Sequence, residues 1–189
     1  MASTWVFLRH GQCQGNVGRL LVAPEDSPLT AAGWAQVRDA AAVLASFGIE
    51  RIVSSPTLRA RQTAAAVLER CPACHLVVLD ALRERSFGPM DRWPIEQVRS
   101  SAWASTRTAW QHAPPDGETL AGVADRAIGA LASLDPAGPT LVVTHAGVIR
   151  SVVGLLDGAP PDRIGCMKVP FAVPWRRRVP EERWAQLGR

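Results

Sequence analysis

The stretch Thr4-Trp5-Val6-Phe7-Leu8-Arg9-His10-Gly11 decides how this 189-residue sequence is interpreted. Its first five residues are apolar or β-favouring, which is typical of a short buried strand. Arg9 and His10 follow that strand directly, and Gly11 allows the backbone to turn sharply. In open α/β sheets, ligands bind beyond the carboxyl ends of the strands. This position therefore favours chemistry over core packing.

A second predicted strand end has the same arrangement. The stretch Arg51-Ile52-Val53-Ser54-Ser55-Pro56 predicts a short strand that the proline stops, followed by an alanine-rich helix over residues 57–70. We expect Ser55 to be the N-cap of this helix and Arg59 to lie in its first turn. A cation there opposes the helix dipole, unless an anion binds to both. Arg59 is therefore a candidate anion ligand.

A third predicted strand ends at a histidine. Thr140-Leu141-Val142-Val143-Thr144 is β-favouring, and the small residues after His145 predict the start of a helix. If the three strands are parallel neighbours, Arg9, His10, Arg59 and His145 converge on one pocket. Two guanidinium groups and two imidazoles form an anion site, and the arginines suit the oxygens of a phosphate.

This ordered set of motifs resembles the histidine phosphatase superfamily, the phosphoglycerate-mutase-like group. The resemblance covers roughly residues 4–155, and the set in this order is far more specific than any one motif. It is nearest to the small bacterial phosphatases, such as the α-ribazole phosphatases and the broad-specificity phosphatases. The matching residues are Arg9-His10-Gly11-Gln12 with Asn16, Ser54-Ser55-Pro56 with Arg59, Leu82-Arg83-Glu84-Arg85-Ser86-Phe87-Gly88, Pro114-Pro115-Asp116-Gly117-Glu118-Thr119 and Thr144-His145-Ala146-Gly147.

The resemblance implies a role for each matching residue. His10 would be the nucleophile that accepts the phosphoryl group, with no metal and no cofactor. Glu84 would protonate the leaving oxygen and then activate the water that hydrolyses the phosphohistidine. The remaining site residues would bind the phosphate oxygens, and these are Arg9, Asn16, Arg59, His145 and Ala146, with Gln12 as a secondary candidate.

The identity of the acid stays open at this point. Glu84 lies between two arginines, so a surface ion pair is its alternative interpretation. Glu118 is the second candidate acid, although an acidic residue just before a helix also has a structural explanation.

The alternation of strands and helices predicts an α/β fold, a three-layer sandwich with a mostly parallel central sheet and helices on both faces. We expect one domain over residues 1–189, with residues 86–116 as a cap that sets specificity. Further helices are expected over residues 30–47 (capped by Thr30), 94–112 and 118–134, and a strand over residues 75–79. Residues 168–173 suggest an edge strand, and irregular structure is expected after it.

Composition adds limits on partners and location. The formal net charge of +4 comes almost wholly from arginine, and the one basic run, Arg176-Arg177-Arg178, is too short to predict nucleic-acid binding. No apolar run is long enough for a membrane span, and no signal peptide is evident, so we expect a cytoplasmic protein. Cys71 and Cys74 form only half of a zinc site, so no metal is expected. Cys13, three residues after His10, is interpreted as a small space-filling residue, with oxidation of its thiol as the alternative.

Among the family's activities, we expect a phosphatase. The interval from Gly88 to Pro114 is short, contains no lysine, and the whole chain contains no tyrosine, which disfavours a phosphoglycerate mutase. The expected partner is a small phosphate ester: α-ribazole phosphate, a sugar phosphate or a nucleotide. Trp93, Trp103 and Trp110 would suit a ring-bearing substrate if they lined the pocket. A protein phosphatase acting on phosphohistidine or phosphotyrosine is the other alternative, and a homodimer is left open.

Overall fold

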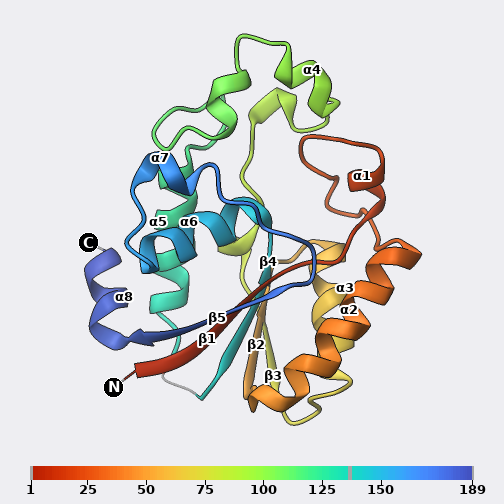
Figure 1. The fold of residues 1–189 in the computed structure, drawn as a ribbon, viewed down its shortest axis with the longest axis vertical. Coiled ribbons are helices and arrows are strands. Elements are labelled where there is room, and N and C mark those ends of the chain that lie inside the picture. The colour runs from red at the N-terminus through yellow and green to blue at the C-terminus, as the bar shows by residue number, and fades with distance from the viewer. Residues whose placement is uncertain (1, 136–137, 189) are drawn as a thin grey trace.

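The computed structural model describes residues 2–135 and 138–188, which form a five-stranded sheet with helices on both faces (Figure 1). The strands lie in the order β3-β2-β4-β1-β5, with the first four parallel and β5 antiparallel to β1. The predicted α/β sandwich with a mostly parallel sheet is therefore confirmed. The strands are β1 (Ala2–Arg9), β2 (Arg51–Ser54), β3 (His75–Val78), β4 (Thr140–Thr144) and β5 (Pro174–Pro180).

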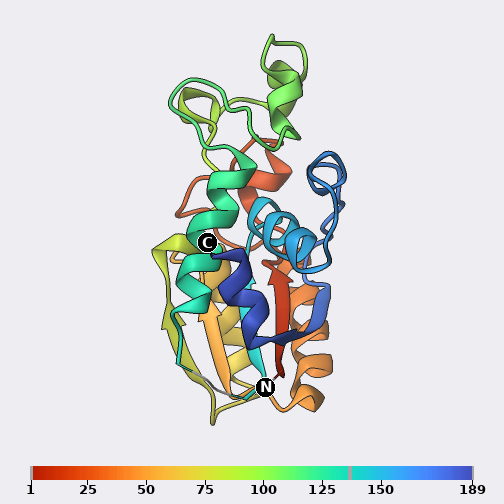
Figure 2. The same ribbon diagram turned by 90° about the vertical axis from the view of Figure 1, so that its left-hand side faces the viewer.

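Alternating side chains of the strands face two separate cores, as the pleat of a strand requires. Trp5 and Phe7 of β1 pack with the helices α5 (Leu120–Ala132), α6 (Ala146–Leu156) and α8 (Glu181–Leu187). Val6 and Leu8 pack on the other face with α2 (Ala31–Leu44) and α3 (Leu58–Leu68). Figure 2 shows the sheet between these two layers. Within residues 2–135 and 138–188, no helix is long and apolar enough to cross a membrane.

The register of the parallel strands brings their carboxyl ends to one edge of the sheet. Arg9 of β1 is level with Thr144 of β4, and Ser54 of β2 is level with Val143. The ladder continues one residue further, because the backbone N–H of His10 donates to the Thr144 carbonyl at 3.0 Å. The three predicted strand ends therefore meet, as parallel pairing demands.

Helix starts agree with the predictions at one position and differ at another. Thr30 caps α2, since its side chain accepts from the Gly33 N–H at 3.0 Å. Ser55 does not cap α3, whose N-cap is Thr57. The Ser55 hydroxyl is instead engaged with a histidine across the sheet, and the first free N–H of α3, on Leu58, donates to the Glu25 carbonyl at 2.8 Å.

Two other predicted elements were wrong. Residues 94–112 contain only the short helices α4 (Ile95–Arg99) and η4 (Ala104–Arg107), not one continuous helix. Residues 168–173 form a loop, and the edge strand is β5, which begins after it. In β5 the partly or fully buried Trp175, Arg177 and Val179 alternate with exposed residues. This period of two is a strand signal that the prolines and arginines obscured.

The remaining elements connect these layers. The segment from the end of β3 to α5 rises above the carboxyl edge of the sheet (Figure 1). It carries a small apolar cluster of its own, centred on Phe87, Met90 and Val98. The other short helices are α1 (Gln14–Val17), η1 (Ala45–Phe47), η2 (Asp80–Leu82), η3 (Gly88–Met90) and α7 (Pro161–Ile164). That residues 86–116 act as a specificity cap stays a prediction.

Candidate active site

His10 lies at the centre of the carboxyl edge of the sheet, with 3% of its surface exposed. Its Nδ1 is 2.7 Å from the carbonyl oxygen of Gly11. Because a carbonyl only accepts hydrogen bonds, Nδ1 must carry the hydrogen. The other ring nitrogen, Nε2, therefore keeps a lone pair, and the Nε–H of Arg59 donates to it at 3.2 Å. This tautomer presents Nε2 as the nucleophilic atom.

Arg59 reaches His10 from the first turn of α3 and is buried. Its Nη1 donates to the Pro24 carbonyl at 2.7 Å, which fixes one end of the guanidinium. Its Nη2 lies 3.5 Å from Nδ1 of His145. A guanidinium has no acceptor, so both histidines offer a lone pair to Arg59. The predicted placement of Arg59 in the first turn, beside the two histidines, agrees with the structure.

His145 is fully buried at the start of α6 and packs edge-to-face on His10, with ring centroids 5.1 Å apart. Its Nε2 is 2.8 Å from the Ser55 hydroxyl oxygen. Since Nδ1 accepts from Arg59, Nε2 carries the hydrogen and donates it to Ser55. Ser55 thus fixes the tautomer of His145, a role that the sequence did not indicate.

Burial and the neighbouring cations keep both histidines neutral. Burial, followed by the charges of Arg59 and Arg9, lowers the pKa of His10 well below its usual value. Burial also lowers the pKa of His145, with further contributions from His10 and Arg59. A neutral imidazole is nucleophilic and an imidazolium is not, so this environment suits nucleophilic catalysis near neutral pH.

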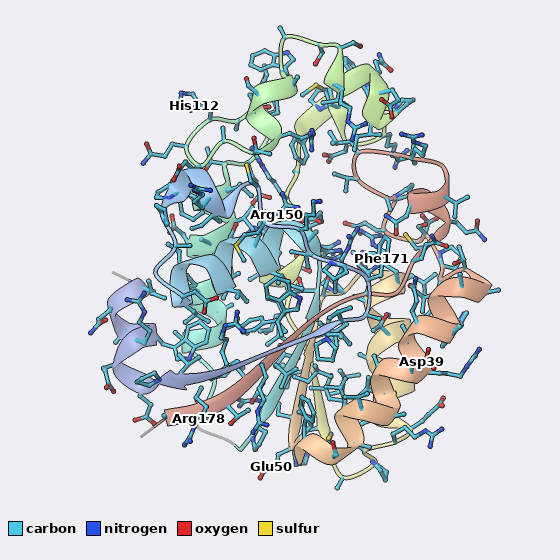
Figure 3. The ribbon with its side chains drawn as sticks, viewed as in Figure 1. Asp39, Glu50, His112, Arg150, Phe171 and Arg178 are labelled. Atoms are coloured by element: carbon cyan, nitrogen blue, oxygen red, sulfur yellow. The ribbon has the colours of Figure 1, made fainter. Side chains whose placement is uncertain are left out.

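The arginines around His10 are held by backbone carbonyl groups. Arg9 donates to the Val169 carbonyl at 2.8 Å, and Arg150 on α6 (labelled in Figure 3) donates to that of Gly165 at 2.9 Å. Buried Arg85 donates to the carbonyls of Glu118, Arg107 and His112. A carbonyl orients a guanidinium without neutralising its charge. The site therefore has a strong positive potential, although burial lowers the pKa of Arg9 to about 10.

Glu84 makes no surface ion pair with the arginines beside it in the sequence. Its carboxylate accepts from the backbone N–H groups of Arg85, at 2.9 Å, and Gly147, at 3.0 Å. The second of these lies in the first turn of α6, where the helix dipole stabilises an anion. A Cβ at Gly147 would collide with the Glu84 carboxylate, so glycine is what permits this approach. Arg83 instead pairs with Glu25 and Asp80.

Glu118 is occupied by a structural ion pair. Arg126 donates to both of its oxygens, at 2.7 and 2.9 Å, and the Ser86 N–H donates at 3.0 Å. Burial raises the pKa of the Glu118 carboxyl, but these hydrogen bonds outweigh it and hold the pKa below its usual value. The ion pair with Arg126 gives Glu118 a structural role, whereas Glu84 has no side-chain ion pair among the described residues and lines two cavities, so the geometry favours Glu84 as the acid.

The other predicted site residues lie in the segment after β1 and at the start of α6. Asn16 accepts from the backbone N–H and the thiol of buried Cys13, both at 3.0 Å. Gln12 accepts from the Thr30 hydroxyl at 3.0 Å and so braces the start of α2. Ala146 begins α6, and its phosphate-binding role would come from the N–H groups of that first turn. Phosphate binding by Asn16 and Gln12 stays a prediction.

Two cavities meet at Glu84. The larger has a volume of about 500 Å³ and is called the polar cavity here, because charged and polar side chains dominate its lining. Among the described residues, its lining includes no aromatic side chain. It is lined by residues 22–25, Thr57, Arg59, Asp80, residues 83–86, Asp91, Arg92, Glu118 and Arg126. The smaller, about 200 Å³, is called the arginine cavity; it is lined by Arg9, Leu21, Glu84, Arg85, Phe87, Ile95, Arg107, Leu120, Ala146, Gly147 and Arg150.

The three tryptophans of the predicted cap do not line the polar cavity. Trp93 packs on the small cluster around Phe87, Trp110 packs against the core beneath α5, and Trp103 is 38% exposed. The cap does contribute a cation, Arg107, to the arginine cavity. Its Nε is buried and has no hydrogen-bond partner among residues 2–135 and 138–188.

The arrangement has the parts needed for phosphoryl transfer: a neutral imidazole, uncompensated arginines and a carboxylate between two cavities. The model of the histidine phosphatase superfamily (branch 1) matches residues 5–184. The chain belongs to this superfamily. The predicted family membership is thus confirmed.

Relatives of this histidine phosphatase have different activities. The "Uncharacterized phosphatase PhoE" of Bacillus subtilis (strain 168) is 30% identical over 160 residues, which cover 82% of this chain and 78% of the relative. A 2,3-bisphosphoglycerate-dependent phosphoglycerate mutase of Methylobacterium radiotolerans is 30% identical over 183 residues, covering 89% and 86%. The solved mycobacterial glucosyl-3-phosphoglycerate phosphatase with VO3 is 28% identical with a TM-score of 0.82, covering 93% and 90%.

The described part of this histidine phosphatase contains no cluster of three or more histidine, cysteine, aspartate or glutamate side chains able to hold a metal ion. Cys71 and Cys74, the predicted half of a zinc site, are free cysteines. Cys13 is also free and fully buried.

Proposed function

We propose that this histidine phosphatase is a metal-independent phosphomonoesterase that acts through a phosphohistidine on His10. The observation that carries the proposal is the state of His10: Nε2 keeps its lone pair, burial favours the neutral ring, and Arg59 donates directly to the reactive atom. Arg9 completes the phosphate site, while phosphate binding by His145, whose Nε2–H is donated to Ser55, stays a prediction.

The reaction has two steps. In the first, Nε2 of His10 attacks phosphorus, the bond from phosphorus to the ester oxygen breaks, and Glu84 gives its proton to the leaving oxygen. In the second, the Glu84 carboxylate takes a proton from water, whose oxygen attacks phosphorus and breaks the bond to nitrogen. Inorganic phosphate leaves and His10 is restored. One difficult displacement becomes two easier ones, each stabilised by fixed positive charge.

The polar cavity supports a sugar phosphate as the substrate. Carboxylates and arginines of its lining are acceptors and donors for hydroxyl groups, and the absence of an aromatic wall from its described lining disfavours stacking of a base. The solved relative that acts on a glucosyl-phosphoglycerate is consistent with a sugar-bearing substrate. A small phosphorylated metabolite, rather than a protein, is the partner that we propose.

One observation favours the second candidate, mutase-type transfer. Arg107 and Arg150 line the arginine cavity next to Glu84, and a carboxylate would suit them. A phosphoglycerate carries such a group.

A panel of esters in EDTA tests both candidates. We expect release of inorganic phosphate from sugar phosphates, with weaker release from nucleotides and α-ribazole phosphate. Failure to release phosphate from every ester, or dependence on a divalent metal, would reject the phosphatase. With 3-phosphoglycerate, formation of the 2-isomer without free phosphate would favour the mutase. His75→Ala, which changes an exposed histidine at the opposite end of the sheet, is the matched control for His10→Ala.

A further inference from the structure

The loop before β5 wraps around Arg9, the residue that precedes the nucleophile. The Val169 carbonyl accepts from Arg9 Nη1 at 2.8 Å, and the Ala172 N–H donates to the Arg9 carbonyl at 3.0 Å. Between these two contacts lies Phe171, beside the carboxyl end of β1 (Figure 3). A loop about 160 positions later in the sequence thus holds both the backbone and the side chain of Arg9.

The ring of Phe171 lies against the face of the Arg9 guanidinium. The Cζ atom of Arg9 is 3.8 Å from the ring centroid, the shortest such distance among the described arginine–aromatic pairs. The same ring is tilted by 48° against the His10 imidazole, with centroids 6.0 Å apart. Phe171 therefore contacts both the phosphate-binding cation and the nucleophile.

An aromatic face constrains a guanidinium differently from a carboxylate. A carboxylate binds the N–H edge, neutralises the charge and competes with phosphate for the same donors. A ring fixes the plane of the guanidinium and leaves its edge free for oxygen atoms. Nη1 of Arg9 donates to the Val169 carbonyl, and its buried Nε has no hydrogen-bond partner among residues 2–135 and 138–188.

The backbone holds Phe171 in place at a local cost. Ala172 has a φ of 50°, in the left-handed region that non-glycine residues seldom adopt. This conformation turns the chain so that the Ala172 N–H reaches Arg9 while the preceding ring covers it. Strained residues that persist in folded proteins cluster at functional sites.

We propose that Phe171 is a positioning residue that fixes the plane of the Arg9 guanidinium, so that its free edge faces the phosphate oxygens. The inference rests on the proposed phosphatase activity and adds a residue from outside the matching motifs. Phe171 itself does not touch the phosphate; it acts through Arg9.

The test compares Phe171→Leu with Phe171→Tyr, which keeps the aromatic face. The readouts are the inhibition constant of inorganic phosphate, kcat and KM for p-nitrophenyl phosphate, and the thermal midpoint. We expect Phe171→Leu to raise the inhibition constant and lower kcat/KM by about 5- to 30-fold, as expected for a desolvated cation–π contact. Phe171→Tyr should stay within about twofold of the wild type.

A double-mutant cycle shows whether Phe171 acts through Arg9. Lysine keeps the charge but has no plane to fix, so Phe171→Leu should add little to the loss caused by Arg9→Lys. Phe47→Leu is the matched control, because Phe47 also stacks on an arginine, Arg176, at 5.4 Å in a different part of the molecule. It should not change the inhibition constant.

Each alternative outcome is decisive. An unchanged inhibition constant in Phe171→Leu, full additivity in the cycle, or an equal loss in Phe47→Leu would overturn the inference. So would unfolding of both Phe171→Leu and Phe171→Met while Phe171→Tyr stays folded, because Phe171 would then be a core residue. A wild type that neither hydrolyses esters nor binds phosphate would instead reject the proposed function.

Discussion

The strand ends beneath the site and the segment 86–116 above it are built by different forces. His10 and His145 each lie one residue beyond the end of a strand in the parallel part of the sheet, and both side chains are buried. The segment above has short helices and one small apolar cluster, and the buried Arg85, which precedes the segment, ties it down through the carbonyl groups of Arg107 and His112. The ladder supplies geometry that any phosphate ester needs, whereas the upper segment can vary without disturbing it.

The largest effect should come from the lower part of the site. We expect His10→Ala to reduce kcat by at least about 10⁴-fold, because no neighbouring group can replace the nucleophile. Phosphate release from a sugar phosphate measures this. His75→Ala should retain full activity, and comparable activity in the two variants would show that the strand ends are not the catalytic centre.

The second-largest effect should distinguish the two candidate acids, Glu84 and Glu118. Glu84→Gln should lower kcat by about 10²- to 10⁴-fold, since glutamine cannot exchange a proton. Glu118→Gln should mainly lower the thermal midpoint, because it weakens the contact with Arg126. Steady-state kinetics and thermal unfolding of both variants give the answer. Full activity in Glu84→Gln together with its loss in Glu118→Gln would assign the role of the acid to Glu118.

A third prediction concerns pH and folding. Both histidines have a lowered pKa in the folded protein, so the unfolded chain takes up protons first as the pH falls below 6.5. Their contribution to stability is therefore present above pH 6.5 and lost as the pH falls toward the folded pKa. Each histidine should contribute a slope of up to about 1.4 kcal/mol per pH unit.

Chemical unfolding between about pH 7.5 and about pH 5.5 measures this slope, since these values lie about one unit on either side of the ordinary histidine pKa. His145→Asn should reduce the slope by one histidine's share. An unchanged slope in this variant would mean that His145 binds a proton equally readily in the folded and unfolded states.

The smallest effect should come from the upper segment. Arg107→Ala should raise KM about fivefold for esters that carry a second anionic group, without changing kcat for p-nitrophenyl phosphate. Arg99→Ala is the control, since Arg99 lies on α4 and pairs with Glu96 at the surface. A large loss of kcat in Arg107→Ala would place this arginine among the groups that act on the transition state.

The difference between the strand ends and the segments around them also explains which site residues could be predicted from the sequence. His10, Arg59 and His145 were found because a local pattern, an apolar strand followed by a turn or helix start, places each of them at the sheet edge. Arg107 and Phe171 have no such pattern. Arg107 lies where a continuous helix was expected, and Phe171 lies where an edge strand was expected. Their positions depend on contacts with residues far away in the chain.

Ser55 and Glu118 illustrate a second reason why the roles of some residues could not be predicted from the sequence. Both fit a local helix-start pattern, but tertiary contacts decided their roles: Ser55 binds His145, and Glu118 binds Arg126. A helix cap is worth only about 1 kcal/mol, so a buried partner easily outweighs it. Sequence patterns were therefore reliable for the three strand ends of the site and weaker for how individual polar groups are paired.

The loop that covers Arg9 also sets an order of events during synthesis. Arg9 leaves the ribosome early, whereas its partners Val169 and Phe171 are translated about 160 residues later. At typical rates of 5–20 residues per second, roughly 8 to 32 seconds separate them. Throughout that interval Arg9 lacks this brace, and β1 lacks its β5 neighbour. The nascent chain therefore acquires a complete phosphate site only after residues 169–172 have been translated.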